Sequence, residues 1–283
     1  MHVVRKKITR KIPDKLCISF AYLRTFGRLP NLTYPKTFNE KICRRRLYPD
    51  PVYSILSDKV RVRDYVELMI GKKYLLPHYN TCRNLSVKTY EQLPESFVMK
   101  CNHGSGYNLI VKDKSRYSYA TLFNKSTEWL ASNYYISSRE LHYKNIKPQL
   151  IFEKLLLDEQ GNVPKDYKFY CFRKPGETPV VFIEVTHDRF SHYKVDYYDQ
   201  DWELVEVVED RFTTGKKIAK PDNLDEAVTL ALKLSEGFSF ARVDFYMLQD
   251  HIYFGEITFT PTGGLKHFKS RAIDKQWGAL FDR

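Results

Sequence analysis

The sequence predicts an α+β protein, with a helical front, a small strand-and-helix lobe and a larger antiparallel sheet that carries one long helix. Three observations lead to this class. Apolar residues recur at helical spacing early in the chain and alternate at strand spacing later. Aromatic residues, mostly Tyr and Phe, make up 15% of the chain and favour strands. A hydrophobic fraction of 43% over 283 residues can build the core of one large domain or of two to three lobes.

The helices of the N-terminal segment are predicted largely from the residues that end them. A first helix is expected over residues 1–28, because Gly27 and Pro30 mark its end. A second helix is expected over residues 57–71, where apolar residues share one face, Ser57 serves as the cap and a glycine ends the helix.

The later elements follow from the same two periodicities. The long helix of the larger lobe has Asn223 as its expected cap and Gly237 at its end. A further helix is expected over residues 121–136 and a short one in the C-terminal tail. The expected strands are 72–80, 96–101, 108–112, 149–157, 167–173, 179–186, 193–199, 203–207, 240–248 and 251–259.

Most of the net charge belongs to the start of the chain. Residues 1–46 contain 13 basic and 2 acidic residues, which gives 13 − 2 = +11, against +12 for the whole chain. Such a segment favours an anionic surface, either as a helix lying on a membrane or as an arm attracted to an acidic polymer. The alternative is a basic helix that packs its apolar face on the body and leaves its charges in solvent. No nucleic-acid-binding motif is present, so no nucleic-acid partner is expected.

Cysteines and hydropathy limit the class of protein. The five cysteines are scattered and form no C-x-x-C pair, which favours a reduced, cytosolic protein without a zinc site. No apolar run approaches the roughly 18 residues of a membrane span, and the N-terminus lacks the pattern of a signal peptide.

The stretch "VMKCNHGSGYNLIV", residues 98–111, has two interpretations. Two apolar strands flank Gly104-Ser105-Gly106, as in an ordinary hairpin. The same turn can form a lid whose backbone N–H groups hold phosphate, with Lys100 adding positive charge. It is neither a P-loop nor a dinucleotide fingerprint, because a strand and not a helix follows.

Two carboxylates stand inside the last two apolar strands. A three-residue loop at 249–251 pairs Asp244 with Glu256 and Arg242 with Thr258. Opposed carboxylates repel each other, and a divalent cation between them removes the conflict; Mg²⁺ accepts one or two carboxylates together with phosphate oxygens. The alternatives are that both carboxylates point to solvent or that Arg242 alone neutralises one of them.

Other charged residues in apolar surroundings are weaker candidates. Glu153 stands at the mouth of a buried strand, where it is either an edge residue or part of a site. Asp166 and Lys168 share one face of the next strand, and by itself this pattern favours a salt-bridged surface over a site. The histidines show no metal-binding spacing, and no G-x-S-x-G nucleophile motif occurs.

Taken together, these motifs resemble the ATP-grasp superfamily, and most of all its TupA-like branch, which is linked to teichuronopeptide and other surface-polysaccharide biosynthesis. The resemblance runs from "TFNEKI" and "SDKVRVRDYV" through "FVMKCNHGSG", "FEKLL", "KDYKFYCF" and "FARVDFY" to "FGEITFTPTGG". It implies two α+β lobes that sandwich ATP, preceded by a basic helical segment. The implied division is 1–75 for this segment, 76–150 for the small lobe with the glycine lid and 151–283 for the large lobe.

The resemblance also implies roles for individual residues. Lys59 and Lys100 match the lysines that touch the phosphates, and Arg242 matches the arginine that steadies the γ-phosphate or acyl phosphate. The common E-x-N metal motif reads here Glu256-Ile257-Thr258, which puts the second Mg²⁺ in doubt. The implied sets are catalytic Arg242, Lys100 and Lys168; ATP-binding Lys59, Lys100, His103, Gly104, Ser105, Gly106, Glu153, Lys154, Leu155, Leu156 and Asp166; metal-binding Asp244, Glu256 and Thr258; and substrate-contacting His103, Arg189, Lys266 and His267.

The activity implied by the resemblance is an ATP- and Mg²⁺-dependent carboxylate–amine ligase that works through an acyl phosphate. The expected partners are an acidic or lipid-linked glycan precursor, an amino acid or other amine, and an anionic membrane contacted through residues 1–46. The expected location is the cytoplasm, peripherally at the inner face of the membrane. Two alternatives stay open, a sugar kinase of the same fold and a non-catalytic scaffold in a glycan-assembly complex.

Overall fold

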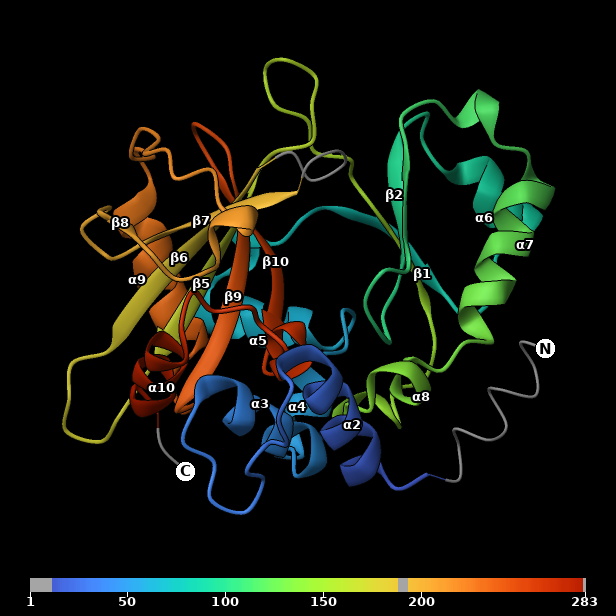
Figure 1. Cartoon of the computed structure of the whole chain (residues 1–283). Coiled ribbons are helices and arrows are strands. Elements are labelled where there is room, and N and C mark those ends of the chain that lie inside the picture. The colour runs from blue at the N-terminus through green and yellow to red at the C-terminus, as the bar shows by residue number, and fades with distance from the viewer. Residues whose placement is uncertain (1–11, 188–192, 282–283) are drawn as a thin grey trace. The chain divides into compact units, whose positions relative to one another are not determined.

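The computed structural model describes residues 12–187 and 193–281, and its chain forms two compact units (Figure 1). The described parts of Met1–Pro49 and Lys165–Arg283 make up the first unit, and Asp50–Pro164 makes up the second. The second unit is therefore an insertion in the sequence of the first. Both units combine an antiparallel sheet with helices, so the predicted α+β class is confirmed.

The first unit is built on a six-stranded antiparallel sheet in the order β10-β9-β5-β6-β7-β8. Long apolar and aromatic runs form its central strands, which are buried over most of their length. The strands are β5 (Asp166–Phe172), β6 (Val180–His187), β7 (Lys194–Tyr198), β8 (Leu204–Val205), β9 (Phe240–Met247) and β10 (Ile252–Thr258). All the large-lobe strands predicted from the sequence are present, although the one expected at 203–207 is only two residues long.

One face of this sheet packs against the long helix α9 (Leu224–Leu234). The helix buries five residues at helical spacing, Leu224, Ala227, Leu230, Ala231 and Leu234. The expectation that Asn223 caps α9 with its side chain is wrong. Its amide nitrogen donates instead to the carbonyl oxygen of Leu248, at 2.8 Å.

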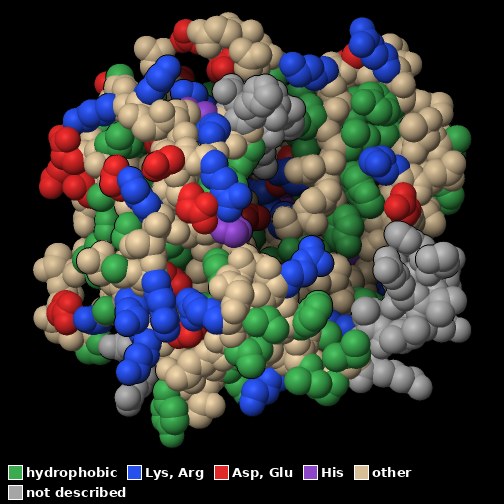
Figure 2. Space-filling view, in the orientation of Figure 1, with side chains coloured by type: hydrophobic (Ala, Val, Ile, Leu, Met, Phe, Trp, Pro, Cys, Tyr) green, Lys and Arg blue, Asp and Glu red, His purple; other side chains and the backbone are tan. Residues whose placement is uncertain are grey.

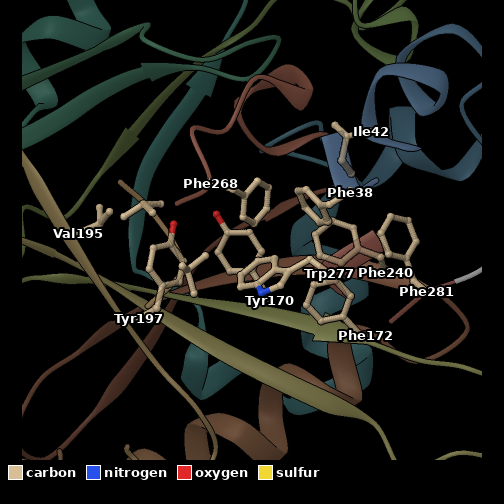
Figure 3. Close-up of a cluster of buried hydrophobic side chains, with 12 residues drawn as sticks. Phe38, Ile42, Tyr170, Phe172, Val195, Tyr197, Phe240, Phe268, Trp277 and Phe281 are labelled. Atoms are coloured by element: carbon tan, nitrogen blue, oxygen red, sulfur yellow. The ribbon is translucent and has the colours of Figure 1, made fainter. Parts of the chain in front are cut away.

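The other face is divided along the strands into an aromatic part and a charged part. Lys168, Tyr170 and Phe172 of β5 all project from this face. Tyr170 and Phe172 belong to an aromatic core, whereas Lys168 lies in the charged part. Helices α3 (Phe38–Leu47) and α10 (Arg271–Ala279) contribute the other side of that core (Figure 3). Its buried members are Phe38, Ile42, Tyr170, Phe172, Val195, Tyr197, Val207, Val208, Phe240, Phe268, Trp277 and Phe281.

The motif "TFNEKI" explains how α3 is held. Thr37 accepts a hydrogen bond from the N–H of Glu40, and the Glu40 side chain accepts one from the N–H of Thr37, which forms a capping box. Phe38 is fully buried. The third residue, Asn39, bonds in both directions to the backbone of Lys266.

The N-terminal helix α2 (Asp14–Phe26) ends at Gly27, as the sequence predicts, in a left-handed conformation with φ of 67°. The part of the predicted helix at residues 1–11 lies outside the described residues. No helix in the described ranges is both long enough and apolar enough to cross a membrane.

The second unit contains a four-stranded antiparallel sheet in the order β1-β4-β2-β3. Its strands are β1 (His78–Cys82), β2 (Phe97–Cys101), β3 (Asn108–Val111) and β4 (Leu150–Glu153). The strands predicted around the glycine turn, at 96–101 and 108–112, are confirmed within one residue. The helices are α4 (Val52–Leu56), α5 (Val62–Ile70), α6 (Val87–Gln92), α7 (Tyr119–Leu130) and α8 (Tyr134–Ser138).

The predicted start of the second helix is wrong. Ser57 ends α4, and α5 begins only at Val62. The carboxylate of Asp58 explains the difference, because it accepts hydrogen bonds from the N–H groups of Val60 and Arg61 and so stabilises a turn ahead of the helix. This turn places Lys59 outside the helix.

Candidate functional site

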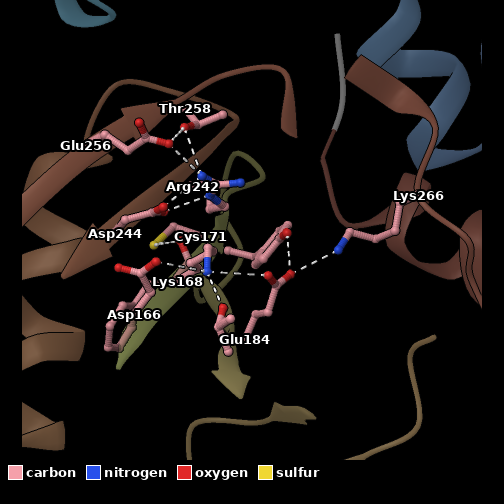
Figure 4. Close-up of polar contacts among 12 residues, drawn as sticks. Asp166, Lys168, Cys171, Glu184, Arg242, Asp244, Glu256, Thr258 and Lys266 are labelled. Atoms are coloured by element: carbon pink, nitrogen blue, oxygen red, sulfur yellow. Dashed lines mark hydrogen bonds and ion pairs between the residues drawn. The ribbon is translucent and has the colours of Figure 1, made fainter. Parts of the chain in front are cut away.

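A row of charged side chains crosses the six-stranded sheet of the first unit (Figure 4). In neighbouring strands Glu256 pairs with Asp244, Asp244 with Lys168, and Lys168 with Glu184, and the row continues to Tyr197. Directly paired residues project from the same face, so these groups lie side by side. Lys168 thus supplies a cation between two carboxylates of the row.

Arg242, two residues before Asp244, joins both predicted metal ligands. Its Nε and Nη2 atoms donate to the two oxygens of Asp244, each at 2.7 Å, and Nη2 also lies 2.8 Å from Oε1 of Glu256. Thr258 donates to the same oxygen of Glu256 at 2.9 Å. Arg242 therefore contacts both carboxylates. One alternative left open by the sequence was that it neutralises only one of them.

The predicted pairing of Asp244 with Glu256 is confirmed, but its cause differs from the prediction. The turn is shifted by one residue, since Met247 pairs with Ile252 and the N–H of Leu248 donates to the carbonyl oxygen of His251 at 2.8 Å. A β-bulge between Phe254 and Glu256 then restores the predicted register. Gly255 occupies the bulge, where an added Cβ would lie 3.0 Å from the carbonyl oxygen of Asp244. The bulge brings the two carboxylates opposite each other.

Burial sets the electrostatics of this pair. Burial raises the pKa of Asp244 to about 7, and the carboxylate of Glu256 acts in the same direction, against the effect of Arg242. The Arg242 guanidinium itself keeps its proton, since the carboxylates raise its pKa far above the ordinary value in spite of burial. The pair is thus a place where additional positive charge would be stabilised.

The donor set fits Mg²⁺ in chemistry and in number. Asp244 and Glu256 supply hard carboxylate oxygens, and Mg²⁺ takes one or two of these while phosphate and water complete its shell. Within residues 12–187 and 193–281, no group of three His, Cys, Asp or Glu side chains is arranged to hold a metal. The residues present suit an ion brought by a phosphate ligand rather than one held by protein alone.

Lys168 continues the row toward β6. Its Nζ atom lies 2.5 Å from the hydroxyl of Thr186, 3.7 Å from Oε1 of Glu184 and 3.8 Å from Oδ2 of Asp166. Its side chain is 12% exposed, so the amine is held on several sides but not sealed off. Lys168 and Asp166 do share one face, as the sequence predicted.

Glu184 is a heavily bonded carboxylate of the row, and the sequence interpretation missed it. Its Oε2 accepts from the hydroxyls of Tyr170 at 2.8 Å and Tyr197 at 2.5 Å, and lies 3.0 Å from Nζ of Lys266. Burial would raise its pKa, but Lys266 and Lys168 outweigh burial and lower it. The sequence did contain a signal for Glu184, because it is a carboxylate within an apolar strand, as Asp244 is. In the structure both carboxylates pair with Lys168.

The position of Lys266 is fixed by backbone contacts. Asn39 donates from its amide to the Lys266 carbonyl at 2.8 Å and accepts from the Lys266 N–H at 3.0 Å. Gly264 makes this contact possible, because an added Cβ there would lie 2.6 Å from the carbonyl oxygen of Asn39. Burial lowers the pKa of Lys266, against the effect of Glu184.

Of the remaining predicted substrate contacts in this unit, His267 lies apart from the network. His267 lies with Nδ1 3.2 Å from Oε1 of Glu209 and packs beside Phe212 and Phe26. Arg189 lies outside the described residues.

In the second unit, Lys100 and Glu153 form a buried ion pair at 2.7 Å. Arg63 Nη1 approaches the other oxygen of Glu153 at 3.7 Å. Burial would raise the pKa of Glu153, but Lys100 and Arg63 outweigh it and lower the pKa. Glu153 is therefore neither a solvent-exposed edge residue nor an isolated acid, because two cations hold it ionised.

The residues that follow Glu153 continue the chain in an irregular, partly buried conformation. The N–H of Lys154 donates to the carbonyl oxygen of Pro77 at 2.9 Å. Leu155 and Leu156 are buried. These positions form no strand, since β4 ends at Glu153.

The glycine turn is anchored at one end. Nζ of Lys59 donates to the carbonyl oxygen of Gly104 at 2.9 Å, so the two predicted phosphate elements touch. Gly104 is buried under Tyr134, and an added Cβ would lie 2.7 Å from that side chain. Gly106 has a φ of 82°, a conformation that favours glycine. Ser105 and Gly106 are exposed, so the tip of the turn is more accessible than its base.

Asn102 and His103 support the base of the turn. The fully buried Asn102 donates to Asp58 and to the carbonyl of Lys147, each at 3.0 Å, and accepts from the N–H of Gln149 at 2.7 Å. His103 is also buried, with Nε2 3.2 Å from the carbonyl of Ser132 and its ring stacked on Tyr107. In this structure His103 therefore packs at the base of the turn.

Sequence comparison assigns the chain to a family. The model of the TupA-like ATP-grasp family matches residues 40–282. No curated protein matches the sequence at a significant level.

The solved structures that resemble this chain are distant from it. N5-carboxyaminoimidazole ribonucleotide synthetase from Thermus thermophilus is 11% identical over 78% of this chain and 51% of its own, with a TM-score of 0.43. D-alanine–D-alanine ligase from Bacillus anthracis complexed with ATP is 14% identical over 73% and 56%, with a TM-score of 0.44. The ATP-grasp ligase PsnB is 10% identical over 82% and 61%, with a TM-score of 0.39.

The chain therefore spans less than two thirds of the length of these three structures. The family assignment rests on the sequence model, which covers most of the chain and includes every charged residue of the row. On this match the chain belongs to the TupA-like ATP-grasp family.

Proposed function

We propose that this protein is an ATP-dependent carboxylate–amine ligase. The observation that carries the proposal is the charged row, in which Arg242 and Lys168 alternate with Asp244 and Glu256 on one face of the sheet. ATP is proposed as the nucleotide because the chain belongs to the ATP-grasp family. The row contains cations, and carboxylates able to bind a metal, which phosphoryl transfer to a carboxylate needs.

The reaction has two balanced steps. A substrate carboxylate oxygen attacks the γ-phosphorus of ATP and forms an acyl phosphate. The bond between the γ-phosphorus and the bridging oxygen breaks, and ADP leaves. The amine nitrogen then attacks the acyl carbon, phosphate leaves, and the amine loses a proton to give the amide. When bound, Mg²⁺ at Asp244 and Glu256 would neutralise phosphate charge.

The protein's own groups position and neutralise the reactants. Arg242 is assigned to the transferred phosphoryl group, where its planar fork suits phosphate oxygens. Lys168 is assigned to the developing acyl phosphate. Lys59 and Lys100 are assigned to the phosphates of ATP, and the exposed tip of the glycine turn to covering them, which protects the acyl phosphate from water.

The proposed substrates follow from the resemblance to the TupA-like branch and from charge. The carboxylate is that of a uronic acid or another acidic unit in a surface-polysaccharide precursor, and the amine is an amino acid. A chain with a net charge of +12 attracts such polyanions at long range.

The test combines the protein, ATP and Mg²⁺ with panels of amino acids and uronic-acid glycans, and follows ADP release and product mass. We expect ADP release that depends on both substrates and a product heavier by the amino acid less water. Stable transfer of phosphate to a sugar hydroxyl without any amine would establish the kinase alternative. Absence of turnover with the correct glycan complex would favour the scaffold.

A single substitution tests the metal assignment. Glu256→Gln should lower turnover by at least about a hundredfold while the fold persists, because the Arg242–Asp244 pair remains. The control is Glu177→Gln, an exposed glutamate paired with Lys174 on the surface, which should keep full turnover. Near-normal turnover of Glu256→Gln would contradict the assignment of Mg²⁺ to this carboxylate.

A further inference from the structure

Helix α2 presents apolar side chains on two opposite faces. Ile18 and Tyr22 are fully buried and pack on the body of the first unit. Leu16, Phe20 and Leu23 are 59%, 66% and 40% exposed. At about 100° per residue these three fall within an arc of about 60°, on the side of the helix away from the buried pair. The outer face is therefore an apolar stripe in contact with solvent.

The surroundings of the stripe are also unusually apolar. Of 13 large hydrophobic side chains exposed among the described residues, seven come from residues 12–48. Figure 2 shows green side chains gathered over the region of α2 at the lower centre of the view, with blue ones beside them. The seven are Ile12, Leu16, Phe20, Leu23, Leu29, Tyr34 and Tyr48.

The charge next to the stripe is positive. Lys15 and Arg24 are exposed and lie on opposite sides of it around the helix, about 110° and about 70° from its centre. The described residues 12–46 contain eight basic and two acidic residues, and one of the acids, Glu40, is buried in its capping box. Apolar and cationic groups thus share this surface almost without acidic ones.

We propose that α2 docks on an anionic lipid bilayer, with Leu16, Phe20 and Leu23 entering the interface and the flanking cations meeting the headgroups. An apolar face flanked by Lys and Arg is the pattern of helices that lie in a membrane interface. A second copy of this chain is a poorer occupant, because a symmetric contact would bring two strongly positive segments together. The docking is independent of the proposed ligase reaction.

The decisive experiment is co-sedimentation of the full chain with vesicles. We expect binding to vesicles of phosphatidylcholine with added phosphatidylglycerol, weak binding to phosphatidylcholine alone, and weakening at high salt. The variant Leu16→Ser with Phe20→Ser and Leu23→Ser should lose at least about tenfold in affinity for the anionic vesicles. It retains every basic residue, so the loss would be due to the stripe.

The matched control replaces three exposed apolar residues of the second unit, Leu68→Ser with Val87→Ser and Leu157→Ser, and should bind as the native chain does. In Phe20→Trp, fluorescence should shift to the blue on anionic vesicles, which tests insertion without removing apolar surface. Unchanged binding of the stripe variant would assign binding to the basic arm alone and overturn the proposal. Failure of the native chain to bind, or a native dimer that the stripe variant splits, would also overturn it.

Discussion

Glu184 joins two lysines to the charged face of the sheet. Its carboxylate contacts Lys266 directly and lies 3.7 Å from Lys168 through its other oxygen. All three groups are largely buried. Loss of the glutamate charge would leave two ammonium groups poorly compensated in an apolar environment.

Glu184→Gln should therefore destabilise the first unit by about 3–5 kcal/mol, as expected when one partner of a buried ion pair is removed. Turnover should fall as well, because Lys168 loses the carboxylate that holds it. Denaturant unfolding and steady-state kinetics measure the two effects. Glu203→Gln, which breaks an exposed pair with Lys217, should cost less than about 1 kcal/mol. Equal effects of the two substitutions would contradict the role given to Glu184.

His103 makes the stability of the second unit depend on pH. Burial lowers the pKa of His103, so the unfolded chain, with a histidine pKa of about 6.5, takes up this proton at higher pH than the folded chain. The unfolding free energy should therefore decrease as pH falls from about 6.5 toward the lowered folded pKa.

The variant His103→Gln isolates this contribution. Its side chain does not titrate, so its unfolding free energy should fall less steeply with pH than that of the native chain over the same window. Urea unfolding at a series of pH values measures both curves. Parallel curves would show that His103 does not bind its proton differently in the two states.

At the scale of elements, the turn between β2 and β3 has a packed base and an open tip. Gly104→Ala should destabilise the second unit by about 1–3 kcal/mol, because the new Cβ would overlap the side chain of Tyr134. It should also displace the carbonyl that Lys59 contacts and lower ATP affinity. Ser105→Ala, at the exposed tip, is the control for stability and should melt as the native chain does. Thermal unfolding with and without ATP compares the two variants.

The sequence predicted most strands and helices because their periodicity reflects which face is buried. It failed where a local hydrogen bond competes with the periodic signal, as Asp58 does at the start of α5. The correct pairing of Asp244 with Glu256 was predicted from a turn whose register differs by one residue from the real one, and the bulge at Gly255 offsets the difference. A bulge depends on contacts between strands, so the pattern along one strand does not reveal it.

The candidate site was predicted in part for the same reason. Asp244, Glu256, Arg242 and Lys168 lie in recognisable motifs and come together as expected. Glu184 and its two tyrosine partners, Tyr170 and Tyr197, were missed, because their association depends on the register of β5, β6 and β7. The residues that the sequence did not indicate are Asn39, Asn102, Tyr170, Glu184, Thr186 and Tyr197.

At the scale of the whole molecule, the described residues 12–49 belong with the C-terminal part of the chain. Phe38 shows how, since its buried ring lies against rings from β5, β9 and α10, including Phe240 at 5.1 Å and Trp277 at 5.6 Å. The front of the chain is therefore part of the core of the first unit and not an appendage to it.

Phe38→Ala should destabilise the first unit by about 3–5 kcal/mol, through lost burial and the cavity left behind. The control is Phe123→Ala, whose ring is 38% exposed on α7 in the second unit, and it should cost clearly less. Calorimetry can follow both variants. A small effect of Phe38→Ala would contradict the central place of this ring in the core.

The insertion of one unit within the other also constrains how the protein is made. The second unit is continuous in sequence, so it can fold on the ribosome while the rest is still being translated. Phe38 is synthesised long before Trp277 and Phe281, which pack against it. Throughout translation of the intervening chain the front segment lacks these core partners, so the nascent protein exposes an aromatic surface that a chaperone can recognise until Trp277 and Phe281 are available to cover it.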